Sequence, residues 1–258
     1  MLSGAVNRKA IRENFERDGF VLIEKIFDEI EMREIDRHLD QYMHMVVPNL
    51  PRDRVFFEAG NIGKIKSMNR INEESDFFSE FKEHPKIKHL VANIFDTEPD
   101  NIVAETLQFF GKPALEGSIT PWHQDNGFQH YEPPESLMIW LALADVDEEM
   151  GCVVFAKGSH ELGVVPHVPS GVLGFSQTVK TPPDPKTYPE VKAVMRRGSI
   201  SLHHCNTFHR SGANETNRPR PALSVNYRTK RAIANLAERA RVKAEVAKLI
   251  QNQDAMMS

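Results

Sequence analysis

The chain has 258 residues, of which 40% are hydrophobic and 26% charged, so it fits a soluble globular protein of one large or two small domains. Its net charge of -4 gives no reason to expect a nucleic-acid partner, and no apolar run reaches the length of a membrane span. Residues 1–10 have no apolar core typical of a secretory signal, and two cysteines, Cys152 and Cys205, cannot form a disulfide framework. We therefore expect a cytoplasmic protein with two free thiols.

The first part of the chain, about 1–98, is dominated by helix-forming sequence. Hydrophobic periodicity predicts helices over about 8–17, 28–45 and 79–95, with Asp28 as the cap of the second one. Between the first two, Asp18-Gly19 predicts a turn into a strand-length apolar run, Phe20–Ile23. The stretch 52–72 is irregular or strand-like.

The second part, about 99–228, contains short apolar runs separated by Gly, Pro, Asn and Asp. This pattern predicts an antiparallel sandwich or barrel. The predicted strands are Ile102–Phe110, Ser136–Ala144, Cys152–Phe155, Ser199–His203 and Ala222–Tyr227.

Two segments allow more than one interpretation. Residues 161–190 contain six prolines and read as a long structureless loop, which is either a lid over a site or a surface excursion. From Lys230 to about Gln251 the chain is helix-forming, with a thin apolar stripe. That helix either packs on its own domain or forms a dimer contact, so both a monomer and a homodimer remain open.

The most informative stretch is Pro121-Trp122-His123-Gln124-Asp125. On a strand, His123 and Asp125 would point to the same face, because alternate side chains share a face. An imidazole and a carboxylate directed at one point suit a transition metal, and a second histidine would complete the facial triad of non-haem Fe(II) oxygenases. Alone, such a tripeptide is more often an exposed turn or a salt-bridged pair.

Candidates for the second histidine lie close together further along the chain. His203, His204 and His209 fall within seven residues, and any one of them is more often a hydrogen-bonded barrel residue than a ligand. Arg220 stands near the start of the strand Ala222–Tyr227. Beside a metal, its guanidinium suits two-point binding of a carboxylate; in isolation it would be a surface cation.

The order of these features resembles the phytanoyl-CoA dioxygenase family of Fe(II)/2-oxoglutarate oxygenases over about residues 11–228. The resemblance lies in Phe15-Glu16-Arg17-Asp18-Gly19-Phe20-Val21, Thr120-Pro121-Trp122-His123-Gln124-Asp125-Asn126, Trp140-Leu141-Ala142-Leu143-Ala144-Asp145, Gly151-Cys152, Lys157-Gly158-Ser159-His160, His209-Arg210-Ser211 and Arg220. The chain departs from the family pattern at Met150, Lys157 and Ser199, which affects turns and no implied ligand.

The resemblance implies a mainly β fold with flanking helices in a single domain, 1–258. Its core would be a double-stranded β-helix (a cupin-like jelly roll) over about 99–228, wrapped by N-terminal helices and a C-terminal helix of about 229–251. The implied Fe(II) ligands are His123, Asp125 and His209, with His204 as a structural neighbour. Arg220, helped by Ser211, would bind the distal carboxylate of 2-oxoglutarate, and the same pocket would be lined by Lys112, Gln108 and Trp140.

The resemblance also implies an activity: a dioxygenase that uses O2 and 2-oxoglutarate, releases succinate and CO2, and hydroxylates an unactivated C–H bond. The substrate would be a small or mid-sized metabolite or natural-product intermediate. Lys64, Lys66 and Arg70 suit an anionic one, although they fit a solvated surface equally well. Desaturation, ring formation and epimerisation stay open. Asp125 fills the position that halogenating relatives leave to chloride.

Two other classes of protein are compatible with a metal-binding jelly roll. One is a non-catalytic cupin-like metal-binding or sensor domain, which loss of a ligand or of Arg220 would favour; both are present. The other is a metallo-hydrolase, which needs an activated water but no arginine placed for a diacid.

Overall fold

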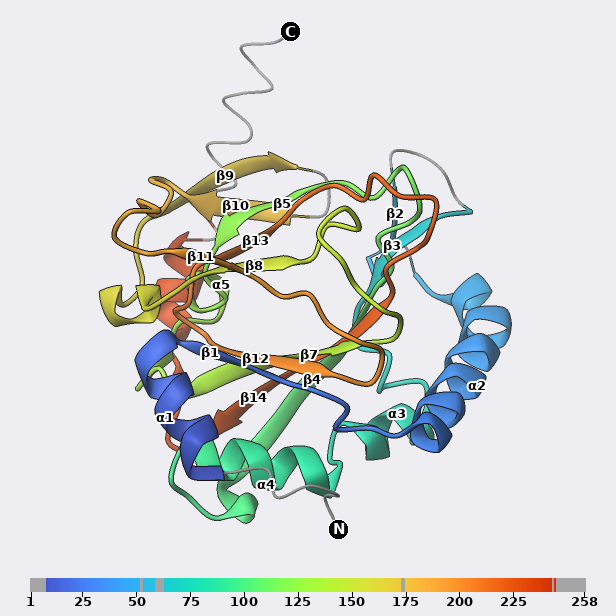
Figure 1. Ribbon diagram of the computed structural model, residues 1–258, viewed down its shortest axis with the longest axis horizontal. Helices are drawn as coiled ribbons and strands as arrows, with labels where there is room; N and C mark the ends of the chain where they lie inside the picture. The colour runs from blue at the N-terminus through green and yellow to red at the C-terminus, as the bar shows by residue number, and fades with distance from the viewer. Residues whose placement is uncertain (1–7, 52, 59–62, 173–174, 243, 245–258) are drawn as a thin grey trace, which may run out of the picture.

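The computed structural model describes residues 8–51, 53–58, 63–172, 175–242 and 244. Within them, two antiparallel sheets lie face to face, one of seven strands in the order β1-β12-β7-β14-β4-β3-β2 and one of four in the order β11-β8-β13-β5 (Figure 1). The larger sheet contains β1 (Phe20–Ile23), β2 (Val55–Phe57), β3 (Ile65–Met68), β4 (Ile102–Phe110), β7 (Ser136–Ala142), β12 (Ile200–His204) and β14 (Ala222–Thr229). The smaller contains β5 (Thr120–His123), β8 (Val153–Ala156), β11 (Glu190–Lys192) and β13 (His209–Ser211). The predicted mainly β fold, with its jelly-roll core and flanking helices, is confirmed.

The strands of the larger sheet separate an apolar face from a polar one, because successive side chains alternate. The apolar face packs against the helices and carries Leu137, Ile139 and Leu141 of β7 among its core residues. On the inward face, Ser224 of β14 pairs in register with Gln108 on one side and Trp140 on the other. Polar side chains therefore line part of the space between the sheets, beside a second apolar cluster that includes Trp140 and Phe155, while the main hydrophobic core lies outside it.

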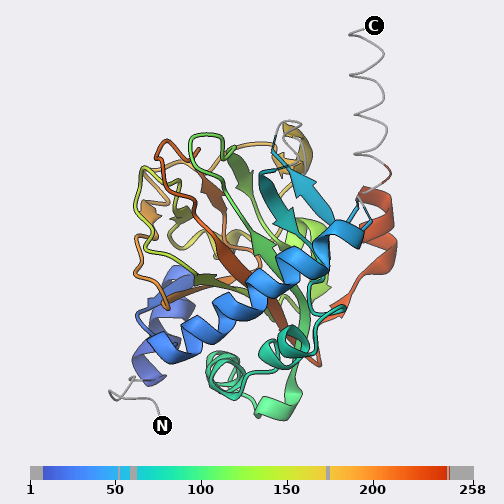
Figure 2. The ribbon, with the colours of Figure 1, turned by 90° about the vertical axis from the view of Figure 1, so that its right-hand side faces the viewer.

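Helices cover the apolar face of the larger sheet (Figures 1 and 2). They are α1 (Arg8–Asp18), α2 (Glu29–Met45), α3 (Asp76–Phe81) and α4 (Pro85–Ile94); the short 3-10 turn η1 (Val47–Asn49) follows α2, and η2 (Pro99–Asn101) follows α4. Asp28 caps α2 as predicted and forms a capping box with Glu31. The single helix predicted over 79–95 is wrong: Pro85 has no backbone N–H to continue a helix and instead begins α4.

The interval 161–190 is not the structureless loop that its prolines suggest. It follows η3 (Ser159–Leu162) and contains β9 (His167–Val172) and β10 (Phe175–Val179), which pair as an antiparallel hairpin. Thr178 Oγ1 donates to the backbone oxygen of Trp122 at 2.8 Å, so the hairpin is tied to β5. It also packs closely on α5 (Asn126–Gln129), since a Cβ on Gly127 would lie 2.4 Å from the His167 ring.

The end of the described chain differs from the expected helix over 229–251. β14 continues to Thr229, and a short strand, β15 (Ile233–Ala234), then pairs with β6 (Tyr131–Glu132). Residues 236–242 are helical, and residues 245–251 of the predicted helix lie outside the described residues.

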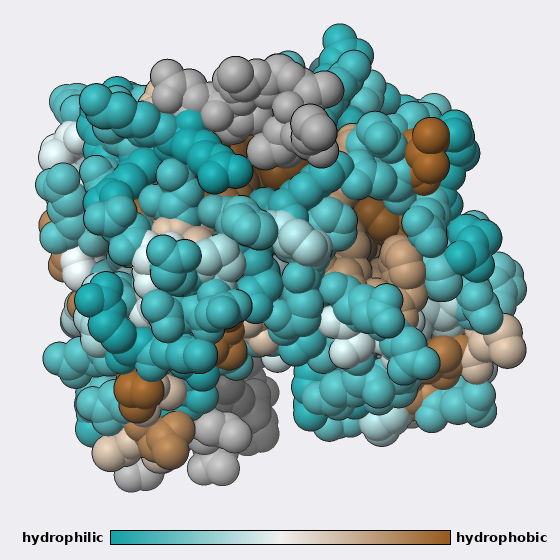
Figure 3. All heavy atoms as spheres, turned by 90° about the horizontal axis from the view of Figure 1, so that it is seen from below, coloured by the Kyte–Doolittle hydropathy of each residue, from teal (hydrophilic) through white to brown (hydrophobic). Residues whose placement is uncertain are grey.

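The described surface is mainly hydrophilic on the side where α4 lies, and hydrophobic side chains reach it in separate groups (Figure 3). Among the described helices, none has both the length and the apolar character needed to span a membrane. Both cysteines, Cys152 and Cys205, are buried free thiols, as expected.

Candidate metal centre

A cavity of about 420 Å³ is lined by strands of both sheets. Its wall includes all eight side chains that the sequence singles out: His123, Asp125, His209, Arg220, Ser211, Lys112, Gln108 and Trp140. Residues that are up to 112 positions apart in the chain therefore meet in one place.

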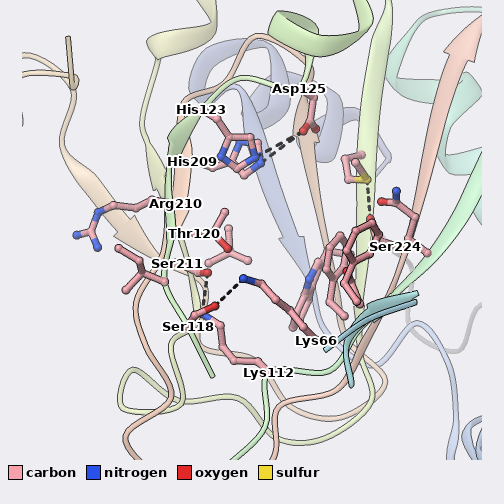
Figure 4. A pocket seen from close by; sticks show the side chains of 18 of the residues that line it. Lys66, Lys112, Ser118, Thr120, His123, Asp125, His209, Arg210, Ser211 and Ser224 are labelled. Atoms are coloured by element: carbon pink, nitrogen blue, oxygen red, sulfur yellow. Dashed lines mark hydrogen bonds and ion pairs between the residues drawn. The ribbon is translucent and has the colours of Figure 1, made fainter. Parts of the chain in front are cut away.

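Two histidines lie side by side on neighbouring strands of the smaller sheet. β5 and β13 pair so that His123 and His209 are direct partners, with ring centroids 3.9 Å apart (Figure 4). Each Nδ1 lies close to a backbone carbonyl oxygen, 2.9 Å from Pro121 for His123 and 3.0 Å from Thr207 for His209. Since only a protonated Nδ1 can donate to a carbonyl, the lone pair of each neutral imidazole is on Nε2.

Asp125 reaches the two histidines by a turn and not by strand alternation. β5 ends at His123, and Asp125 has helical backbone angles (φ -59, ψ -36), with its carbonyl oxygen accepting from Phe128 and Gln129 of α5. Its Oδ1 lies 3.8 Å from Nε2 of His123 and 3.7 Å from Nε2 of His209 (Figure 4). The assumption that one strand carries both His123 and Asp125 is wrong, although the carboxylate does reach the predicted place.

The three groups are in the protonation states that a divalent metal needs. Burial lowers the pKa of His123 to about 4 and lowers that of His209 well below its usual value, so both imidazoles are neutral near pH 7. Burial would raise the pKa of Asp125, but His209 and the hydrogen bond from His203 outweigh it and hold this pKa below its usual value. One ligand atom from each of His123, Asp125 and His209 lies within 4.8 Å of the others.

Arg220 forms a second charged feature of the cavity. Its side chain is buried, its guanidinium lies 4.9 Å from the centre of the Trp140 ring, and Nε and Nη1 have no hydrogen-bond partner among the described residues. Burial lowers its pKa to about 10, which still leaves it cationic. Buried N–H groups of a cation that lack an acceptor are costly, so this part of the wall is suited to an anion.

Lys112 and Ser211 lie together beside Arg220. Lys112 Nζ donates to Ser211 Oγ at 2.8 Å and to the Gly212 carbonyl (Figure 4), and the Arg220 backbone N–H donates to the Lys112 carbonyl at 3.1 Å. Burial, and then the charge of Arg220, lower the pKa of Lys112 to about 6. These contacts place the Arg220 cation, the Lys112 amine and the Ser211 hydroxyl on one part of the wall, where a dicarboxylate co-substrate could bind.

The unusual pKa of Lys112 leads to a prediction. In the ligand-free protein Lys112 loses its proton as the pH rises through about 6, whereas a bound dianion favours the charged amine. The affinity for 2-oxoglutarate should therefore fall by up to about tenfold per pH unit between about pH 6 and 8, and Lys112→Met should remove this slope. Calorimetric titration of the Mn(II)-loaded protein would measure it. A flat profile in the native chain would contradict the assignment.

The remaining pocket residues are placed as follows. Gln108 Nε2 donates to Asn69 Oδ1 at 3.1 Å on the cavity wall. Of the three cations suggested for an anionic substrate, only Lys66 lines the cavity; Lys64 pairs with Glu116 at 2.5 Å, and Arg70 is exposed outside it. The suggested three-cation surface does not form.

His204 lies outside the cavity, as the resemblance implies. Its Nδ1 accepts from the backbone N–H of Asn206 at 3.1 Å, and its ring packs near Phe15 of α1 and His160.

His203, next to it in the chain, lines the cavity, and its contact with Asp125 was not predicted from the sequence. Its Nε2 lies 3.2 Å from Asp125 Oδ2. A signal was present: Ile200 and Leu202 belong to the core under the helices, so strand alternation directs Ser201 and His203 inward.

None of the described residues between 161 and 190 lines the cavity. The hairpin instead contacts Gln124, which stands between His123 and Asp125. The backbone N–H of Gln124 donates to His167 Nε2 at 3.3 Å, and the Gln124 side-chain amide donates to the Gly163 carbonyl at 2.7 Å. The choice between a lid and a surface excursion stays a prediction.

Known proteins are similar to this chain over most of its length. The family model for Phytanoyl-CoA dioxygenase (PhyH) matches residues 15–222. The phytanoyl-CoA dioxygenase domain-containing protein 1 homolog of Caenorhabditis briggsae is 26% identical over 268 residues, covering 85% of this chain and 90% of that protein.

Two solved structures from nogalamycin biosynthesis are also similar. The epimerase SnoN, in complex with Fe3+, alpha ketoglutarate and nogalamycin RO, has a TM-score of 0.71 at 23% identity, covering 90% of this chain and 87% of that one. The carbocyclase SnoK has a TM-score of 0.71 at 19% identity, covering 88% and 85%. These two likenesses show the fold, while the family model matches most of the chain. This chain therefore belongs to the phytanoyl-CoA dioxygenase family.

Proposed function

We propose that this chain is a non-haem Fe(II)- and 2-oxoglutarate-dependent dioxygenase that hydroxylates a small or mid-sized molecule. The observation that carries the proposal is that one cavity combines two neutral imidazoles and a carboxylate with a buried arginine whose Nε and Nη1 have no hydrogen-bond acceptor among the described residues. The family membership and the SnoN complex, whose description includes both Fe3+ and alpha ketoglutarate, support it. A metallo-hydrolase would leave the unpaired Arg220 without a role.

The described residues fit both absent groups. His123, Asp125 and His209 offer two nitrogen donors and one oxygen donor, the ligand set that suits Fe(II) with open positions. Bound there, Fe(II) would supply oxygen activation. Arg220 and Ser211 would bind the distal carboxylate of 2-oxoglutarate, and Trp140 would hold the guanidinium plane in place. The enclosing sheets would limit the access of water.

The rest of the wall limits the substrate. The cavity of about 420 Å³ must also hold 2-oxoglutarate, so the substrate or its reacting part is small. Apart from the residues assigned to the metal and 2-oxoglutarate, the wall includes apolar side chains, amides and a lysine: Phe56, Phe128, Met138, Asn69, Gln108 and Lys66. Lys66 donates to Ser118, which also donates to the buried Glu58 carboxylate, so a negative group lies close to the lysine. This favours a polar, uncharged or zwitterionic substrate over a purely anionic one.

A metabolite panel tests the proposal, with succinate release measured for each compound in the presence of Fe(II) and ascorbate. The true substrate should stimulate succinate release and gain one oxygen atom. If no compound changes the rate and 2-oxoglutarate itself is never consumed, the protein is not an oxygenase of this type and the non-catalytic metal-binding alternative takes over.

Asp125 allows a prediction about the product. Because its carboxylate fills the third protein position at the metal, halide has no protein-provided place to bind. We expect the same hydroxylated product in chloride and in bromide buffers, measured by mass spectrometry. A product that carries the halogen would refute the assignment of Asp125. A desaturated, cyclised or epimerised product would leave it intact, since those outcomes depend on how the substrate is held.

A further inference from the structure

A third histidine touches the proposed metal site and has no role in the function described so far. His203 lies on β12 between Phe20 of β1 and Met138 of β7, its register partners. Its side chain is almost fully buried, and its ring packs 5.1 Å from Phe155 and 4.3 Å from His209, centroid to centroid. Neighbours on several strands therefore fix the direction of this ring.

The hydrogen bond to Asp125 determines which nitrogen of His203 carries the proton. Nε2 lies 3.2 Å from Asp125 Oδ2, and a carboxylate can only accept. Nδ1 is buried and has no partner among the described residues. A proton on Nδ1 alone would set the Nε2 lone pair against the carboxylate and leave a buried N–H unpaired, so the proton belongs on Nε2.

The two oxygens of Asp125 consequently have different neighbours. Oδ1 is the oxygen that lies 3.8 and 3.7 Å from the Nε2 atoms of His123 and His209, whereas Oδ2 accepts from His203. One oxygen is directed at the metal-binding point, and the other is held away from it.

We infer that His203 is a positioning residue that keeps Asp125 a one-oxygen ligand and thereby preserves the coordination positions that 2-oxoglutarate needs. The inference rests on the proposed function. With a six-coordinate metal, three single-atom protein ligands would leave three positions, enough for a chelating 2-oxo acid together with O2. If Oδ2 were free, a two-oxygen carboxylate would occupy one of these three positions and compete with the co-substrate.

A pair of substitutions separates this role from simple packing. In His203→Gln, the side-chain amide can place an N–H near the position of Nε2, whereas in His203→Asn the shorter amide reaches only about as far as Nδ1. Both keep a polar side chain on β12. His204→Asn is the matched control, because the same substitution one residue later changes a side chain outside the cavity.

The measurement is calorimetric titration of 2-oxoglutarate into each protein loaded with Co(II), a redox-stable stand-in for Fe(II). We expect His203→Asn to weaken 2-oxoglutarate binding about tenfold, and His203→Gln and His204→Asn to stay within about threefold of the native chain. Thermal unfolding of the metal-free proteins checks folding. If His203→Asn does not fold, His203→Phe, which keeps an aromatic ring beside Phe155 but has no donor, takes its place with the same expectation.

Two results would overturn the inference: native-like binding in the variant that lacks the donor, or a loss in His203→Gln as large as in His203→Asn. A native Co(II) protein that binds no 2-oxoglutarate at all would instead refute the proposed function, so the two failures are distinguishable.

Discussion

Replacement of His209 by alanine is expected to remove most of the bound iron and, with it, all measurable turnover. In the proposed site, His209 supplies one of two imidazole nitrogens in a set of three protein ligands found among the described residues. Changes to partners that merely orient a ligand often weaken metal binding about 10- to 100-fold, so loss of a ligand should cost at least about 100-fold. The same result is expected for His123→Ala and Asp125→Ala. Metal content after gel filtration and Co(II) titration would measure the effect.

His204→Asn is the control for these variants. Its amide oxygen can accept the hydrogen bond that Nδ1 now accepts from Asn206, and the side chain lies outside the cavity. This variant should keep its iron. If it loses the metal while His209→Ala keeps it, the ligand assignment is wrong.

The second large effect concerns Arg220. A charge-assisted hydrogen bond to an ionised group contributes about 1.5–3 kcal/mol, so Arg220→Ala should weaken 2-oxoglutarate roughly ten- to a hundredfold. The metal should remain, because Arg220 is not among the three ligands. Titration of 2-oxoglutarate into the Mn(II)-loaded variant measures the change directly.

Arg218 offers the matched control, two residues earlier in the chain. Its guanidinium is exposed and pairs with Asp147 at 2.5 Å, and it does not line the cavity. Arg218→Ala should bind 2-oxoglutarate like the native chain. An unchanged affinity in Arg220→Ala would mean that another group binds the distal carboxylate.

Local sequence signals predicted the regular elements well. The run Ile102–Phe110 coincides with β4, and Asp28 caps α2 where its side chain was expected to do so. Such features depend on neighbouring residues: alternation of apolar side chains in a strand, and backbone N–H groups that need an acceptor at a helix start. Neighbouring residues also determine approximately where a helix or strand ends.

Features that depend on contacts between distant segments could not be read from the chain alone. Pro-rich sequence hid the β9–β10 hairpin, because its strands are stabilised by pairing with each other and by packing on β5 and α5. Lys64 looked like a substrate-binding cation, but Glu116, 52 residues away, neutralises it. Side-chain charge indicates a possible partner, whereas only the fold decides which partner it meets.

For some site residues the sequence predicted a role, and for others it predicted neither the role nor the contacts. The resemblance implied roles for His123, Asp125, His209 and Arg220, and the fold brings all four to one cavity, yet Asp125 arrives through the turn into α5 and not along a strand. The contact of His203 with Asp125 depends on how β12 faces β5 across the sandwich, which no local pattern encodes.

One measurement tests the central claim most directly: consumption of 2-oxoglutarate by the purified chain with Fe(II), O2 and ascorbate, without any added substrate. The reaction without substrate is expected to be slow. It supports the account if more succinate forms than with free Fe(II) alone. We predict that the native chain produces succinate, that His209→Ala falls to that background, and that Arg220→Ala needs roughly ten- to a hundredfold more 2-oxoglutarate to reach the native rate. Succinate formation at the same rate in the native chain and in His209→Ala, or none in either, would contradict the account.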